Sequence, residues 1–413
     1  MYPRIIEKEI GKYLDCKQAI FILGARQVGK TSLLNRLIQK LPKHHTFYFD
    51  LSRISDRRLI ESGTDEFLQF LKFQGLDLSH RNYIFIDEIQ YFDEFSGFVK
   101  ILVDHHSDAV KLILSGSSAA QIKTRFKDSL AGRKYIFHLY PLTFKEFLVF
   151  KEMSTWAEKI DKPCYACTSD NLRFCRKEIL FLLNEFMVFG GYPEIAKITQ
   201  PDKKVKYLKE ILDAYIIKDI RAIFSIGNTE GFNHLVRYTA INVANLFSVN
   251  SAANEIGLAR ETISHYINIL EDTFILKRLR PFYLNKTTEL KKAAKIFFMD
   301  NGLRNALLDN FNALELRNDQ GLLIENHVFS QLHKNKAETD GIYFWRTTSR
   351  QEIDFIIKQG DILYPLEVKV SGGRAAHMKK FMNQYQCKHG FVASLKQPFD
   401  VAGDVTVLPV YLI

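Results

Sequence analysis

The motif Gly24-Ala-Arg-Gln-Val-Gly-Lys-Thr31 is the strongest indication of the fold of the N-terminal part of the chain. It satisfies the pattern G-x-x-x-x-G-K-[ST], follows the apolar run Ala19-Ile-Phe-Ile-Leu23, and opens a segment with helical periodicity, residues 32–41, which Pro42 stops. Strand, glycine-rich loop and helix in this order are the context in which the pattern forms a phosphate-binding loop. The sequence therefore predicts a nucleotide site between a buried strand and a helix.

The residue types of this loop suit a nucleoside triphosphate with magnesium. Backbone N–H groups and the helix N-terminus bind phosphate oxygens, while Lys30 reaches the β- and γ-phosphates and Thr31 ligates the metal. We predict ATP and Mg²⁺ as cofactors. The expected nucleotide contacts come from Gly24, Ala25, Arg26, Gln27, Val28, Gly29, Lys30, Thr31 and Ser32.

A second motif, Tyr83-Ile-Phe-Ile-Asp87-Glu88, is an apolar strand that ends in two carboxylates. Beside a phosphate-binding loop, this arrangement predicts that Asp87 holds magnesium and that Glu88 polarises the attacking water. The alternative interpretation is an acidic N-cap for the following helix.

Two further candidates accompany the nucleotide site. Ser115 ends another apolar run, in Ser115-Gly-Ser-Ser118, and could bond the γ-phosphate or the attacking water; tight-turn chemistry is the alternative. Arg133 follows Ser129-Leu-Ala-Gly132 and could act as an arginine finger on the nucleotide of a neighbouring subunit. The alternative for Arg133 is an ordinary surface arginine.

Apolar runs divide the chain into parts. Continuous runs at 46–51, 83–86, 110–114 and 135–139 alternate with helical patterns, which predicts an α/β domain with a parallel sheet over residues 1–145. A helical connector is expected over 146–247, a winged helix-turn-helix over 248–320, and a second α/β domain over 321–413. The strand signals of the last part are at 343–346, 353–357, 364–370 and 390–394.

The helix-turn-helix is predicted from two short helical patterns. Ser251 to Gly257 is a capped helix that ends in glycine, and Ile263, Ile267 and Leu270 share one face of the next helix, residues 261–272. The other face carries polar side chains that could meet phosphates or base edges, although Glu261 among them is unfavourable for DNA: Arg260, Ser264, His265 and Asn268.

The region of the expected wing is the most basic stretch of the chain. It predicts sequence-tolerant nucleic-acid contact, and a purely architectural winged helix is the alternative. Its cations, set against the single acidic Glu289, are Lys277, Arg278, Arg280, Lys286, Lys291, Lys292 and Lys295.

The C-terminal part carries the order D…E-x-K, in Asp354, Glu367 and Lys369. Alternation along a strand places Glu367 and Lys369 on one face, so Asp354 and Glu367 could hold magnesium while Lys369 activates water near a phosphodiester. Glu325, on a predicted helix, is a further candidate metal ligand. The alternative is a salt-bridged pair on a solvated strand. Trp345, near this site, is expected to pack in the core, and the nearby His327 and Arg346 are candidates for shaping it.

Together these motifs resemble the AAA-type ATPases of bacteria and archaea that end in a domain of unknown function with a restriction-endonuclease-like core. The resemblance covers nearly the whole chain except the cysteine-bearing stretch 156–176, and it implies an ATPase core, a winged-helix linker and a nuclease-like tail. Besides the C-terminal residues above, it rests on Gly24 to Thr31, Asp87-Glu-Ile-Gln90, Leu114-Ser-Gly-Ser-Ser118, Leu130-Ala-Gly-Arg133 and Gly190-Gly-Tyr-Pro-Glu194.

Composition sets the remaining limits. The 413 residues are 46% hydrophobic and 25% charged, as in a globular protein of two or three domains, and no apolar run approaches the roughly 20 residues that span a bilayer. We expect a cytoplasmic protein with no membrane partner. Five cysteines do not form a disulfide framework, and Cys164, Cys167 and Cys175 are expected as reduced thiols, with zinc as the alternative.

The predicted function is ATP hydrolysis coupled to the action of a winged helix and a nuclease-like tail on nucleic acid. The formal charge of +10 favours a polyanionic partner. DNA and further copies of the chain are the candidate partners. The rival function is a nucleotide-dependent regulatory switch whose tail is a non-catalytic protein-interaction module.

Overall fold

The computed structural model describes residues 2–117, 130–160, 176–220, 224, 226–285, 287, 289, 292–349, 351–372 and 376–413. The chain forms two compact units. One comprises residues 1–140 with the short segment 272–274, and the other comprises 141–271 and 275–413. The sequence prediction of four parts, with boundaries at residues 145, 247 and 320, stays a prediction. Six residues named in the sequence analysis lie outside the described residues: Ser118, Cys164, Cys167, Cys175, Lys286 and Lys291.

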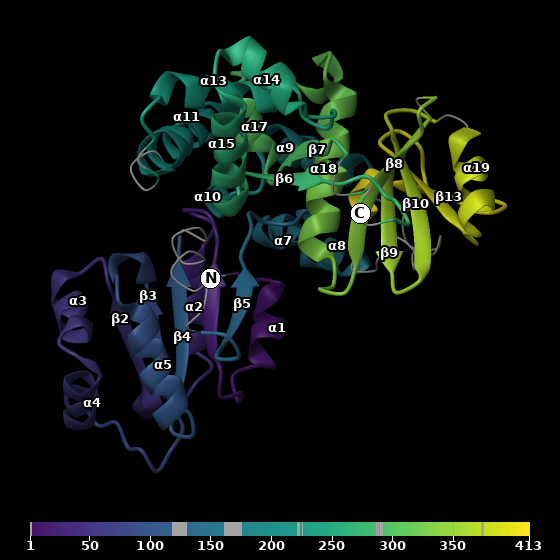
Figure 1. Ribbon diagram of the computed structural model, residues 1–413. Coiled ribbons are helices and arrows are strands. Elements are labelled where there is room, and N and C mark those ends of the chain that lie inside the picture. The colour runs from purple at the N-terminus through teal and green to yellow at the C-terminus, as the bar shows by residue number, and fades with distance from the viewer. Residues whose placement is uncertain are drawn as a thin grey trace. The chain divides into compact units, whose positions relative to one another are not determined.

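The first unit is built on a five-stranded parallel sheet with the order β2-β3-β4-β1-β5 (Figure 1). Burial on both faces explains the continuous apolar runs, since β1 and β4 are buried along their whole length. The strands are β1 (Ala19–Leu23), β2 (Thr46–Asp50), β3 (Asn82–Asp87), β4 (Val110–Gly116) and β5 (Lys134–His138). Each coincides with a predicted strand to within two residues.

Helices flank this sheet, and in Figure 1 α3 and α4 lie beside β2 at one edge. Helix α2 begins at Lys30, directly after the glycine-rich loop, and ends before Pro42 as predicted. Glu7 of the first helix pairs with Arg36 of α2 at 2.9 Å. The helices are α1 (Ile6–Gly11), α2 (Lys30–Ile38), α3 (Ile54–Glu61), α4 (Thr64–Phe73) and α5 (Phe95–His106), with 3-10 turns at Lys43–His45 and Ile89–Tyr91.

The second unit begins with a helical region. Thr143 opens it through a capping box with Glu146. Its helices are α7 (Phe144–Phe150), α8 (Ser154–Lys159), α9 (Arg176–Phe189), α10 (Pro193–Lys197), α11 (Pro201–Ile211) and α13 (Thr229–Ile241), with a π-helix at Leu212–Ile220.

The motif Gly190-Gly-Tyr-Pro has a structural role in this unit. The Gly191 N–H donates to Asp300 Oδ2 at 2.7 Å, and a Cβ on Gly190 would lie 2.2 Å from Asp300 Oδ1. Asp300 also accepts from the Leu303 N–H and so caps helix α17 (Asn301–Leu307). The motif therefore joins the helical region to α17.

Two helices and a strand pair follow the helical region. Helix α14 (Val249–Ile256) ends at Gly257 with φ of 76°, and α15 (Arg260–Asp272) buries Ile263, Ile267 and Leu270 as predicted. Strands β6 (Leu276–Leu279) and β7 (Lys295–Phe298) then pair antiparallel.

The C-terminal part is a six-stranded mixed sheet with the order β12-β13-β11-β10-β9-β8. Figure 1 shows helix α18 (Gln320–Asn335) on one side of this sheet and α19 (Ala376–Tyr385) on the other. Phe329 of α18 stacks on Phe355, and Phe381 of α19 meets Trp345, which is a core residue as predicted. The strands are β8 (Gly341–Arg346), β9 (Glu352–Gln359), β10 (Ile362–Lys369), β11 (Gly390–Ser394), β12 (Asp400–Ala402) and β13 (Val405–Pro409), with 3-10 turns at Leu314–Leu316 and Val410–Leu412.

Among the residues that the structure describes, no helix is both long enough and apolar enough to cross a bilayer.

Candidate nucleotide site and C-terminal carboxylate cluster

The glycine-rich loop is held in a conformation that most residues resist. Gln27 and Gly29 both have positive φ, of 61° and 95°. A Cβ on Gly24 would lie 2.1 Å from the Leu139 carbonyl oxygen, so this position accepts only glycine. From the other side, Arg4 Nη1 donates to the Val28 carbonyl at 2.8 Å. The backbone of the loop is thus fixed before any ligand binds.

Lys30 lies inside this loop as a buried cation. Its Nζ donates to the carbonyls of Gly24 at 3.2 Å and Ala25 at 3.0 Å. Burial lowers the pKa of Lys30, while the carboxylates of Glu88 and Asp87 oppose the shift. An ammonium that has exchanged water for two loop carbonyls is well placed to exchange them for phosphate oxygens.

Asp87, at the carboxyl end of β3, connects the motifs. Thr31 Oγ1 donates to its Oδ2 at 2.6 Å, and the Ser115 hydroxyl donates to its Oδ1. Tyr48 OH, from β2, also donates to Oδ2 at 3.3 Å, and burial together with Asp87 raises the pKa of this phenol. The structure therefore brings the predicted residues Lys30, Thr31, Asp87 and Ser115 to one edge of the parallel sheet.

Glu88 follows Asp87 in the left-handed region, with φ of 57°. Such a conformation in a residue other than glycine is uncommon and clusters at functional sites. Gln90 Nε2 donates to Glu88 Oε2, and Gln90 Oε1 accepts from the Ser117 N–H at 3.2 Å. Gln90 thus links the predicted catalytic carboxylate to the end of β4.

Arg133 lies at the opposite edge of the sheet from the loop. The Ala19 N–H, at the amino end of β1, donates to the Arg133 carbonyl at 2.9 Å. The guanidinium forms a two-point ion pair with Asp104 of α5, at 2.6 Å and 3.0 Å. Arg133 is therefore remote from the nucleotide loop of its own chain, and a role on a neighbouring subunit's nucleotide stays a prediction.

The residues present at the loop fit magnesium bound together with a nucleotide. Mg²⁺ commonly takes one or two protein carboxylates and completes its shell with water and substrate phosphates. Asp87 and the hydroxyl of Thr31 are donors of this kind. Within the described ranges, no three His, Cys, Asp or Glu side chains gather closely enough to hold a metal ion by themselves.

In the C-terminal part, an unexpected residue lies among the predicted carboxylates. Lys295 of β7 contacts Glu325 Oε1 of α18 at 2.9 Å and Glu352 Oε1 of β9 at 2.6 Å, with its side chain 4% exposed. The expectation that Lys295 belongs to a basic surface is wrong. It lies beneath the surface because carboxylates from two other elements compensate its charge.

The D…E-x-K residues lie beside this lysine. Asp354 Oδ2 accepts from the Val368 N–H at 2.7 Å, and burial raises the pKa of Asp354 while Lys295 and Lys369 oppose the rise. Lys369 Nζ contacts Glu367 Oε2 at 2.9 Å. Within the described part of the chain, the buried Oε1 of Glu367 has no hydrogen-bond partner. Arg346 pairs with Glu352, whereas His327 contacts the aromatic rings of Phe144 and Phe186 in the helical region.

The predicted basic stretch is less available for contact with nucleic acid than its number of lysines and arginines indicates. Arg278 is tied to Glu271 of α15, with Nε 2.7 Å from Oε2, and it also donates to Asn268. Lys277, Arg280 and Lys336 nevertheless line a pocket of about 300 Å³ between β6, α18 and β8. The other lining residues are Arg278, Leu279, Glu289, Phe329, His333, Asp340, Ile342 and Tyr343.

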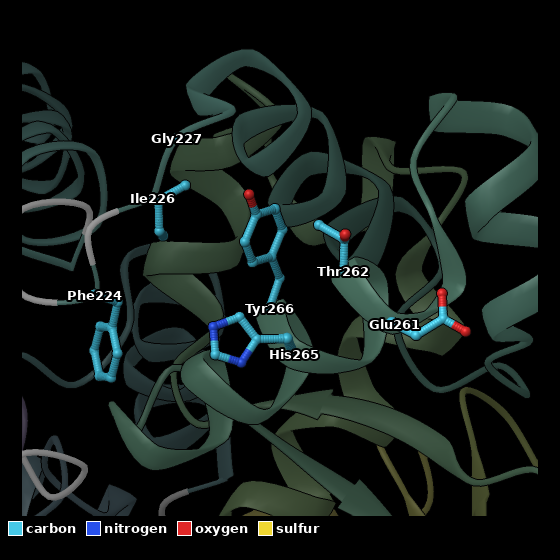
Figure 2. A pocket seen from close by; sticks show the side chains of 7 residues that line it. All are labelled: Phe224, Ile226, Gly227, Glu261, Thr262, His265 and Tyr266. Atoms are coloured by element: carbon cyan, nitrogen blue, oxygen red, sulfur yellow. The ribbon is translucent and has the colours of Figure 1, made fainter.

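A second pocket, of about 380 Å³, lies on the exposed side of α15. Figure 2 shows the rings of His265 and Tyr266 between Phe224 and Thr262, with Glu261 pointing away from them. Arg260, His265 and Asn268 are exposed on this helix, as predicted, and Ser264 is half-buried. The carboxylate of Glu261 beside this pocket disfavours an anionic ligand there.

Several residues of these sites were not among the sequence predictions. Arg4, Tyr48 and Glu352 carry no motif signal because their partners are distant in sequence. Gln90 does belong to a motif, Asp87-Glu-Ile-Gln90, but the motif by itself does not indicate what Gln90 contacts.

The buried loop lysine and the hydroxyls bonded to a strand-end carboxylate define a P-loop domain of the AAA type. Residues 16–148 match the sequence model of the AAA domain. The chain belongs to the family of the uncharacterized protein MJ1544 of Methanocaldococcus jannaschii, to which it is 30% identical over 361 residues, 86% of this chain and 75% of that protein.

Other comparisons extend the similarity without adding a function. An uncharacterized protein of Haemophilus influenzae is 25% identical over 355 residues, 83% of this chain and 80% of that protein. Residues 180–314 and 320–413 match two domains of unknown function, DUF8612 and DUF4143. The ADP form of the Aeropyrum pernix ORC2 protein overlaps with a TM-score of 0.36 at 11% identity, covering 76% of this chain and 96% of that one. An overlap this small supports no argument about function.

Proposed function

We propose that this protein binds ATP at residues 24–32 and hydrolyses it with Mg²⁺. The main observation behind this proposal is that the Asp87 carboxylate accepts hydrogen bonds from two hydroxyls beside the glycine-rich loop. These are the hydroxyl of Thr31, at 2.6 Å, and that of Ser115. Asp87 and Thr31 would hold the metal, which supplies charge neutralisation on the phosphates. Lys30 binds and orients the phosphates, and Glu88 accepts the proton of the attacking water.

The test is turnover by the purified full chain. With Mg²⁺ and ATP we expect steady release of phosphate, which stops when EDTA removes the metal. Binding of a fluorescent ATP analogue, measured in parallel, separates affinity from hydrolysis. Nucleotide binding without any turnover would leave a nucleotide-binding switch and would refute hydrolysis.

Gln90 is proposed as a positioning residue for Glu88. Replacing it with Ala releases the Glu88 carboxylate, and we expect kcat to fall roughly 10- to 100-fold with ATP affinity unchanged, because a misplaced catalytic group loses effective molarity. Gln74→Ala, an exposed glutamine at the end of α4, is the matched control. If Gln90 acts only through Glu88, adding Gln90→Ala to Glu88→Gln lowers kcat no further. An additive loss would contradict this role.

We further propose that ATP turnover is coupled to nucleic acid through α14, α15 and the β6–β7 pair acting as a winged helix, together with a nuclease-like C-terminal domain. The pocket lined by Lys277, Arg280 and Lys336 supports this proposal, since these three cations outnumber the two carboxylates that also line it, Glu289 and Asp340. Such a group suits a phosphate backbone.

The wing proposal predicts a defined salt dependence. For Lys277→Ala/Arg280→Ala, we expect the slope of log affinity for labelled duplex DNA against log salt to become shallower by about 2, one for each lost phosphate contact. Fluorescence anisotropy at several salt concentrations measures it. Lys8→Ala/Lys17→Ala removes the same charge from exposed sites of the first unit and should leave the slope unchanged. Equal slopes for all three proteins would exclude phosphate contact at the pocket.

The alternative function is a regulatory switch in which the nucleotide state controls assembly or partner binding. One part of the switch function, the non-catalytic tail, is supported by the pairing of Lys295 with carboxylates of the C-terminal domain. Turnover that responds to added DNA favours the first function, and turnover indifferent to DNA favours the switch. Arg133 would contribute only if copies of the chain assemble around one nucleotide.

A further inference from the structure

Lys295 occupies the position at which a cation would bind to the C-terminal carboxylates. Its ammonium lies between Glu325 Oε1 and Glu352 Oε1, at 2.9 Å and 2.6 Å, which are ordinary charge-assisted hydrogen-bond distances. The three residues come from β7, α18 and β9. The cluster therefore connects the β6–β7 pair to the C-terminal sheet.

The electrostatics of the cluster keep this ammonium charged. Burial by itself lowers the pKa of Lys295, but the carboxylates of Glu325, Glu352 and Asp354 outweigh burial and raise it above the ordinary value. A second lysine, Lys369, pairs with Glu367, and its pKa is raised chiefly by Glu367, with smaller contributions from Asp354 and Glu325. Lys295 thus pairs with Glu325 and Lys369 pairs with Glu367, which are two of the three carboxylates that the sequence proposes as C-terminal metal ligands.

A divalent metal does not fit this arrangement. Mg²⁺ requires oxygen ligands at about 2.0–2.1 Å in near-octahedral order, with several waters. The ammonium of Lys295 fills the space between Glu325 and Glu352, and the Val368 N–H holds one oxygen of Asp354 at 2.7 Å. A metal beside Lys295 would also be repelled by the positive charge of the ammonium, with which it would have to share Glu325 and Glu352.

We propose that the ammonium of Lys295 takes the place of a divalent cation in the cluster of Glu325, Glu352 and Asp354, and that this cluster joins the β6–β7 pair to the C-terminal domain without metal-dependent phosphodiester cleavage. The proposal does not depend on the nucleotide site. With Lys295 in place, these carboxylates are not gathered closely enough to form a metal site among the described residues. The proposal predicts that removing the ammonium, while keeping the length of the side chain, lets them close around a divalent cation.

The test counts Mn²⁺ bound to the nucleotide-free full chain by electron paramagnetic resonance. We expect Lys295→Met to bind one Mn²⁺ per chain more than the wild type, and Lys295→Met/Asp354→Asn to lose it again. Lys358→Met, which removes a half-buried lysine of β9 outside the cluster, should bind no additional ion. Any Mn²⁺ bound at the nucleotide loop is present in all variants. The difference in bound Mn²⁺ between a variant and the wild type therefore measures binding at the cluster alone. A folded Lys295→Met that gains no ion overturns the proposal.

A measurement that needs no Lys295 variant guards against loss of folding. We expect the wild type and Glu325→Gln to bind equal numbers of Mn²⁺ and neither to cut plasmid or single-stranded DNA with Mg²⁺ or Mn²⁺. An ion that the wild type binds and Glu325→Gln loses, or DNA cleavage that Asp354→Ala abolishes, shows that metal rather than Lys295 serves this cluster.

Discussion

Glu88→Gln is expected to lower kcat for ATP by roughly 10²- to 10⁴-fold, the range that a positioned general base contributes. Glutamine keeps the size of the side chain and can still accept from Gln90, but it cannot take a proton from water. The left-handed backbone at residue 88, with φ of 57°, is tolerated by glutamine as by glutamate, so folding should be unaffected. Single-turnover phosphate release, with nucleotide affinity measured separately, checks the expectation.

The matched control for this variant is Glu94→Gln. Glu94 is exposed, precedes α5 and makes no side-chain cap bond, so its loss of charge should leave kcat unchanged. Because Glu88→Gln retains Lys30, Thr31 and Asp87, it should bind ATP about as tightly as the wild type. Full turnover by Glu88→Gln would show that Glu88 is not the general base, and another carboxylate would then have to accept the proton.

Lys30→Ala is expected to weaken ATP binding severely. A hydrogen bond to a charged group is worth about 1.5–3 kcal/mol, which corresponds to roughly 10- to 150-fold in affinity. Turnover should fall further, because the same ammonium neutralises charge that develops on the phosphates in the transition state. Isothermal titration with a non-hydrolysable ATP analogue measures the first effect and phosphate release measures the second.

Folding must be separated from binding in this variant. Lys30 Nζ donates to Gly24 and Ala25 in the ligand-free chain, so its removal also loosens the loop. Lys30→Met keeps the buried aliphatic stem and serves as the second test, while Lys17→Ala removes a lysine whose side chain is 69% exposed and should behave as the wild type. Unchanged affinity in both Lys30 variants would contradict the role of Lys30 at the phosphates.

The N-terminal fold and most residues of the candidate nucleotide site could be predicted from local patterns in the sequence. Strands such as Ala19–Leu23 are buried on both faces and therefore read as continuous apolar runs. Lys30 and Thr31 belong to one short motif, and Asp87 ends a strand whose carboxyl end must meet the loop in a parallel sheet. Local spacing and sheet geometry were sufficient for these residues.

Weaker local signals explain what the sequence did not predict. The segments that became α19, β12 and β13 were not predicted. Strand β12 is three exposed residues, and it exists because β13 supplies its hydrogen-bond partners. An edge strand of this kind has no apolar pattern to detect.

The environment of the charged and polar residues depends on packing between distant elements. Lys295 follows several cations in sequence, a pattern that predicts a basic surface, yet it is buried against Glu325 and Glu352. The contact of Gln90 with the Ser117 N–H exists only because the end of β4 lies beside it. A charged side chain pairs with whichever residues lie near it in space, whereas a sequence pattern describes only neighbours along the chain. Ion pairs between distant elements therefore depend on how those elements pack.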